Sequence, residues 1–288
     1  MTAAATTEAG ARPSRAWRRP PAPAWIGTVP FFAYVGVFLL LPTGIVIYDA
    51  FRSPSGQYQL AGLKALGSSE VRGFFVGSLE LALISSLAGA VFGAILAYAV
   101  ASGNPDGTVR RLYLAVSGVL AQFGGVTLAF AFLVLIGPIG LLMHASWYQD
   151  FPWGITVIYA YFQIPLMVLV FMPAIDGLKV QWREASESLG ASAWQYWRHV
   201  GAPLLTPAFL GATLLLFANG LSAFATIEAW ENQIAYIVPQ QISTALNSEV
   251  GLANVNVADV LALGMVIMVA IVMTGYALLQ RRAARWLR

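Results

Sequence analysis

Residues 182–208 have the sequence WREASESLGASAWQYWRHVGAPLLTPA, a moderately polar stretch that separates two long apolar ones. Apolar side chains recur at helical spacing on both sides of Gly190, and glycine allows the chain to turn tightly there. Pro203 and Pro207 suit the first turns of a following helix. The stretch therefore predicts two short helices that meet at Gly190 and lie along a membrane surface.

The chain around this stretch is too apolar for a soluble domain. Of its 288 residues, 58% are hydrophobic and only 10% are charged, and the mean hydropathy is +0.71. Soluble domains have about 25% charged residues and are less than half apolar. This surplus of apolar side chains needs lipid as a solvent. The absence of cysteine also excludes disulfide frameworks and thiolate metal sites.

Six stretches are long and apolar enough to cross a hydrocarbon layer of about 30 Å, which takes about 20 residues of helix. The third contains Gly124-Gly125 and Gly137-Pro138, so we expect a kink or break within it. The sequence predicts an all-α membrane protein with six transmembrane helices. The six expected spans are residues 29–51, 74–101, 113–143, 154–177, 204–226 and 260–280.

The basic residues predict the orientation of these spans. With a cytoplasmic N-terminus, thirteen of the sixteen Lys and Arg residues lie on the cytoplasmic side, which is the positive-inside bias. We therefore expect both termini in the cytoplasm, with residues 1–24 as a disordered basic tail and residues 25–288 as the transmembrane domain. A cleavable signal peptide is the alternative, but the first apolar run is longer than the 7–15 residues usual in such peptides.

The loop after the fourth span resembles the cytoplasmic signature of binding-protein-dependent ABC importer permeases. That signature is Glu-Ala-Ala, three residues, Gly, and nine residues before Ile-x-Leu-Pro. The spacing is intact here, with three small departures. The matching positions are Glu184, Ala185, Gly190 and Pro203, while Ser186 stands for the second Ala, Val200 for Ile and Ala202 for Leu.

The resemblance extends from about residue 75 to the C-terminus and implies a type I ABC importer permease in a bacterial inner membrane. It implies that the loop, residues 178–203, forms a coupling helix that docks on a separate ATPase. Glu184 would then pair with a basic residue of that ATPase. The implied partners are two copies of the ATPase, a second permease subunit (a homodimer is the alternative) and an extracytoplasmic substrate-binding protein, all at the lipid bilayer.

The sequence carries no sign of chemistry of its own. A phosphate-binding Walker A loop needs Gly-Lys followed by Ser or Thr, and neither Lys64 nor Lys179 has these neighbours. We expect ATP on the partner subunit, and no cofactor, metal, nucleic acid or catalytic group on this chain. His144 and His199 fall on opposite sides of the membrane, so they do not form a metal site with each other.

Polar side chains inside the spans are candidates for the substrate pathway, because they are costly to place in lipid. Gln122, Gln163 and Asn219 are the strongest, although each can equally bond a neighbouring helix. Glu80 is a weaker candidate, since its carboxylate can reach the outer interface. A further motif, Gly89-x-x-x-Gly93, is typical of a helix-packing face.

For the substrate, the stretches YFQIPLMVLVFMPAIDGL (161–178) and ANGLSAFATIEAW (218–230) resemble the polyamine, thiamine, phosphonate and ferric-iron branch of the family. The hairpin after the fifth span contains Glu228, Glu231, Glu249 and Asp259 with no basic residue, which would suit spermidine or putrescine. Thiamine, an aminophosphonate or ferric iron are alternatives. Two other classes stay open: a secondary transporter driven by an ion gradient, and a membrane scaffold or sensor that transports nothing.

Overall fold

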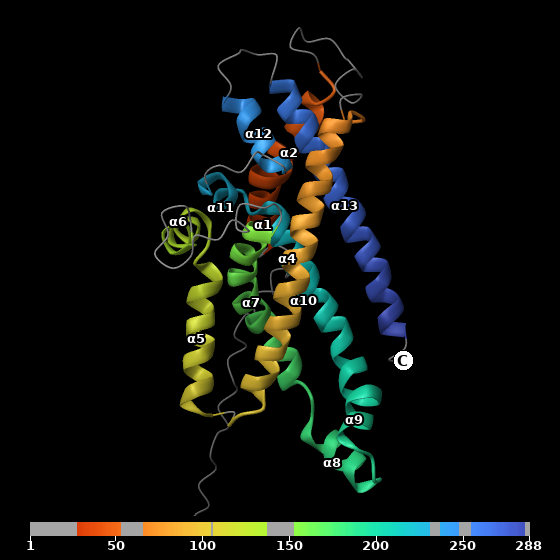
Figure 1. Cartoon of the computed structure of the whole chain (residues 1–288). Coiled ribbons are helices and arrows are strands. Elements are labelled where there is room, and N and C mark those ends of the chain that lie inside the picture. The colour runs from red at the N-terminus through yellow and green to blue at the C-terminus, as the bar shows by residue number, and fades with distance from the viewer. Residues whose placement is uncertain are drawn as a thin grey trace, which may run out of the picture. The chain divides into compact units, whose positions relative to one another are not determined.

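The computed structural model describes residues 28–52, 66–104, 106–136, 153–230, 237–247 and 255–285, with side chains in the last range described for 257–278. Every regular element in these ranges is helical, which confirms the predicted all-α membrane fold (Figure 1). The helices are α1 (Val29–Val35), a π-helical turn (Gly36–Leu40), α2 (Leu41–Asp49), α4 (Ser69–Ala101), α5 (Thr108–Gln122), α6 (Gly125–Ile136), α7 (Trp153–Asp176), α8 (Val180–Ser188), α9 (Ala193–Tyr196), a second π-helical turn (Trp197–Gly201), α10 (Ala202–Ser222), α11 (Phe224–Ala229), α12 (Val238–Asn247) and α13 (Val255–Arg285).

The chain falls into two compact units, divided between Ile45 and Val46. The described part of the first unit is an apolar helical segment that begins with α1. The second unit contains α4 to α13, and its core is built from α4, α7 and α10. The expected cytoplasmic tail, residues 1–24, lies outside the described residues.

Five helical segments among the described residues are long and apolar enough to cross a membrane, and α5 with α6 makes a sixth if this pair is one span. The two helices meet at an angle of 97°, so that α6 turns across the end of α5 (Figure 1). Gly125 has a φ of +68°, a conformation that glycine adopts without strain. The break predicted at Gly124-Gly125 is therefore confirmed, whereas Gly137-Pro138 lies outside the described residues.

The predicted fifth span, residues 204–226, is wrong at both ends. Its helix begins at Ala193 because Ser192 and Gln195 form a reciprocal capping box, each side chain accepting a hydrogen bond from the other's backbone N–H. The helix then runs through the π-helical turn into α10, and this wider turn accommodates Pro203, which has no N–H to donate. At the other end the helix stops at Ser222, and α11 begins two residues later.

Close approach of α4 to α7 depends on the two glycines of the GxxxG motif. A Cβ atom on Gly89 would lie 2.7 Å from Cβ of Gln163, and one on Gly93 would lie 2.5 Å from Cβ of Met167 and 2.8 Å from the carbonyl oxygen of Ile164. Neither helix has room for a side chain at these points, so the interpretation of the motif as a helix-packing face is confirmed.

We expect Gly93→Ala to destabilise the protein by about 1–3 kcal/mol, the usual cost of overpacking, because the new methyl group must push the α7 backbone away. The measurement is thermal unfolding of the purified chain in detergent. Gly73→Ala is the matched control on the same helix, since nothing lies within 4 Å of the added Cβ there. Equal melting temperatures for the two variants would contradict this account of the interface.

Candidate functional site

The loop between α7 and α10 turns at Gly190, as the sequence predicts, but only α8 is a separate short helix, because α9 continues through the π-helical turn into α10. α8 ends in a Schellman motif, in which the N–H of Ala191 donates to the carbonyl of Ser186 and the N–H of Gly190 donates to that of Glu187. Gly190 has a φ of +77°, which the motif requires and which other residues adopt only with strain. The capping box at Ser192 then starts α9. Both sides of the turn are therefore fixed by local hydrogen bonds.

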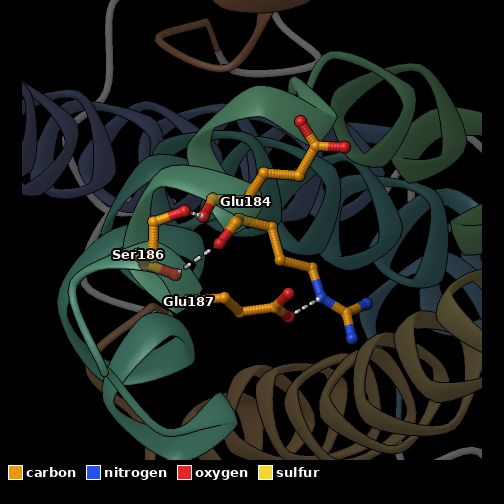
Figure 2. A network of polar contacts seen from close by, with 5 residues as sticks. Glu184, Ser186 and Glu187 are labelled. Carbon is orange, nitrogen blue, oxygen red and sulfur yellow. Dashed lines mark hydrogen bonds and ion pairs between the residues drawn. The ribbon is translucent and has the colours of Figure 1, made fainter.

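Several polar side chains of α8 find partners within the helix, whereas the Glu184 carboxylate does not (Figure 2). Ser186 donates to the carbonyl of Arg183 at 2.7 Å, and Ser188 donates to the carbonyl of Glu184 at 2.9 Å. Arg183 donates from Nε to the Glu187 carboxylate at 2.9 Å, which raises the pKa of the guanidinium. The Glu184 carboxylate points away from this pair and has no partner among the described residues.

Large apolar side chains on this loop are uncovered. Leu189 is 87% exposed at the end of α8, and Trp194 is 72% exposed on α9. Ala185 is also exposed, and its small side chain leaves the surface beside Glu184 accessible. Exposed large apolar side chains that lie close together in the sequence are typical of a surface that binds another protein.

The remaining residues of the signature lie where the loop joins α10. Val200 is half-buried in the π-helical turn, and Pro203 is exposed in the first turn of α10. Between them the Trp197 ring covers Gly201, where an added Cβ would come within 2.7 Å of the ring. The same ring packs edge-to-face on Tyr98 of α4, with centroids 5.1 Å apart. The second arm of the loop is thus anchored on the core.

Two of the four residues predicted for the substrate pathway line one cavity. Gln122 ends α5 and Asn219 lies near the end of α10, and the cavity they share has a volume of about 380 Å³. Both neighbouring helix breaks open onto it, the first between α5 and α6 and the second between α10 and α11. The other lining residues are Ala121, Gly124, Gly125, Phe162, Ser222, Ala223, Phe224, Ala225 and Thr226.

The break between α10 and α11 is held by a residue that the sequence did not single out. Tyr159 of α7 is buried, and its hydroxyl donates to the carbonyl of Ala223. This bond satisfies a carbonyl that a continuous helix would have paired internally. The sequence offers no signal for it, because neither glycine nor proline occurs between Leu221 and Ala229.

The other two pathway candidates do not line this cavity. Gln163 is fully buried, with 0% exposure, and donates to the Ser85 hydroxyl at 3.2 Å. Its amide nitrogen lies against Gly220, so it sits where α4, α7 and α10 meet. Glu80 is exposed on α4. Within the described ranges no group of three or more His, Cys, Asp or Glu residues could hold a metal ion.

Residues 89–288 match the family model described as "Binding-protein-dependent transport system inner membrane component". The chain is 25% identical to the sulfate transport system permease protein CysT of Escherichia coli (strain K12), over 71% of this chain and 76% of that protein. It is also 25% identical to the trehalose transport system permease protein SugB of Mycobacterium tuberculosis (strain CDC 1551 / Oshkosh), over 62% and 59% of the two chains. Among solved structures, it resembles a chain of a bacterial ABC transporter involved in the import of the acidic polysaccharide alginate. The TM-score is 0.69 at 17% identity, covering 90% of this chain and 94% of that one.

Proposed function

Because this chain belongs to the family of binding-protein-dependent transport system inner membrane components, we propose that its α8–α9 loop is the surface through which a separate ATPase drives it. The chain is a multi-pass permease subunit of an ABC importer. The observation that supports the docking role is the Glu184 carboxylate, which is unpaired within the described residues and lies on the short helix α8, whose C-terminal turn with the exposed Leu189 is fixed by two capping motifs. A rigid surface of this kind transmits force without first having to become ordered.

We infer the rest of the assembly from the family to which the chain belongs. A second permease subunit and two copies of the ATPase complete the membrane and cytoplasmic parts, and an extracytoplasmic binding protein delivers the substrate. From the positive-inside bias we infer that the loop and both termini lie on the cytoplasmic side, and we propose a bacterial inner membrane as the location. ATP binds the partner subunit, so this chain supplies the pathway and receives the motion.

For the substrate, we infer a small oxyanion such as sulfate. The cavity shared by Gln122 and Asn219 is lined by amides, the hydroxyl of Thr226 and the backbone of two helix breaks, with no charged side chain among its described lining residues. Amide and hydroxyl donors, together with the start of α6 at Gly125, favour an anion.

The polyamine expectation drawn from residues 161–178 and 218–230 and from the acidic hairpin is not supported. The relatives above are named as sulfate and trehalose permeases, and a cation would need a carboxylate that the described lining of this cavity does not contain. Of the alternatives, thiamine and ferric iron meet the same objection, whereas an aminophosphonate carries an oxyanion that the same donors could hold.

The test is uptake into proteoliposomes that contain the complete complex, with ATP enclosed and the binding protein outside. We expect ATP-dependent accumulation of radiolabelled sulfate and none of spermidine. Accumulation by this chain without the ATPase, driven by an ion gradient, would instead make it a secondary transporter. ATP-dependent accumulation of spermidine alone would overturn the substrate proposal and leave the importer proposal standing.

A further inference from the structure

Two helices, α10 and α5, each have one end that lines the cavity, and their other ends lie toward the α8–α9 loop. α10 is continuous with α9 through the π-helical turn, and its far end carries Asn219 and Ser222 on the cavity wall. α5 ends at Gln122, which also lines the cavity. However, α5 lies more than fifty residues before the loop in the sequence, so a push on the loop reaches it only through contacts in space.

Such a contact exists at the loop end of α5. Nη2 of Arg110 lies 2.5 Å from Oδ2 of Asp176, and the two side chains are 14% and 42% exposed. Asp176 is the last residue of α7, four positions before α8 begins at Val180. The pair therefore joins the first turn of α5 to the end of α7, where the chain enters the α8–α9 loop. From Arg110 to Gln122 is about 18 Å along a helix that rises 1.5 Å per residue.

The positions of both residues argue against a merely local role. Arg110 lies in the first turn of α5, where the helix dipole disfavours a positive charge, and Asp176 lies at the end of α7, where it disfavours a negative one. Each residue would stabilise its own helix better with the opposite charge. Together they compensate each other across the two helices, so the pair stabilises the link between α5 and α7.

We propose that the Arg110–Asp176 ion pair makes α5 follow the α8–α9 loop, so that both walls of the cavity move in one step. The inference rests on the proposed function, since it takes the loop as the point of force entry. α5 transmits the motion as a rigid rod, because Tyr113 and Leu114 pack against the core cluster that includes Phe171 and Ile175. The bend at Gly124-Gly125 then converts the motion into a change at the cavity. Arg110 and Asp176 are positioning residues and do not touch the substrate.

The experiment compares Arg110→Asp, Asp176→Arg and the double exchange in the complete complex. We expect each single variant to lower ATP-driven sulfate uptake about tenfold, within the usual range of coupling between sites, while ATPase association stays unchanged. The double exchange restores uptake to within about twofold of the original, since it recreates the pair with charges that suit both helix dipoles. Arg110→Gln, which keeps a polar side chain and loses the charge, covers the case in which the reversals fail to fold.

Arg111→Asp is the matched control, since Arg111 is the next residue and donates to the local carbonyl of Asp106 at 2.8 Å instead of to another helix. A distance measurement adds a readout that does not depend on the substrate. The chain has no cysteine, so spin labels on Val109→Cys and Val180→Cys, both at exposed sites, report the separation of α5 and α8 alone. We expect one narrow distance, unchanged by trapping with ATP and vanadate, that broadens or shifts in the single variants.

The outcomes separate this inference from the proposed function. If the original complex shows no ATP-dependent uptake, the proposed function fails. If it transports while Arg110→Asp and Arg110→Gln keep both the original rate and the original label distance, the importer proposal stands and the link between α5 and the loop is overturned. Failure of the double exchange to restore uptake that both single variants lose would also overturn it.

Discussion

Gly190→Trp is expected to abolish ATP-driven uptake, whereas Gly190→Ala is expected to retain a substantial part of it. Any side chain at a φ of +77° strains the turn, by about 1–2 kcal/mol. No other part of the described chain lies within 4 Å of the position that a Cβ atom would take. A Cβ atom at this position therefore meets no clash, so Gly190→Ala reports the backbone strain, and we expect the further loss in Gly190→Trp to come from contact with the ATPase.

Three measurements make this prediction decisive: membrane insertion, co-purification of the ATPase, and uptake in proteoliposomes. Insertion should be normal in both variants, while co-purification and uptake should be lost in Gly190→Trp alone. Glu184→Lys, compared with Glu184→Gln, tests the neighbouring charge in the same way, because the carboxylate has no partner in the described chain that the exchange could disturb. Normal ATPase association in both Gly190→Trp and Glu184→Lys would refute the docking assignment.

The turn at Gly190 and the break at Gly124-Gly125 were predictable because each depends on local chemistry. Both have glycine where the chain adopts a positive φ, at Gly190 and Gly125, and the motifs that surround Gly190 use neighbouring residues. The second break, at Ala223, was not predictable. It lies in an apolar sequence that suits a helix, and the bond that holds it comes from Tyr159, sixty-four residues away. Local sequence cannot show a partner that tertiary packing supplies.

The pathway residues show the same limit. Gln122 and Gln163 are both glutamines within apolar stretches, and nothing in their neighbours separates them. In the structure Gln122 lines a cavity, while Gln163 is enclosed between Gly89 and Gly220, whose lack of side chains makes room for it. Which face of a span is open depends on the other helices. The acidic hairpin residues Glu231 and Glu249 lie outside the described chain, so the role predicted for them stays a prediction.

Among substitutions in the cavity, Asn219→Asp should have the largest effect on the uptake of the substrate. The change replaces an amide donor with a carboxylate of nearly the same shape in a cavity whose described lining is uncharged. A carboxylate about 4 Å from a bound anion, at an effective dielectric constant of 20, costs about 4 kcal/mol. We therefore expect ATP-driven sulfate uptake to fall at least about a hundredfold. The change should leave ATPase association intact, since Asn219 lies at the far end of α10 from the loop.

Asn219→Leu and Thr213→Val complete the series. Asn219→Leu removes one hydrogen bond to a charged ligand, worth about 1.5–3 kcal/mol, so its loss of uptake should be smaller than that of Asn219→Asp. Thr213 is on the same helix but donates to the carbonyl of Phe209 at 2.8 Å, so its hydroxyl is already used and Thr213→Val should change little. The substrate classes predict opposite signs for Asn219→Asp, because a new carboxylate repels an oxyanion and attracts a polyamine. If Asn219→Asp transported sulfate normally, Asn219 would not face the substrate.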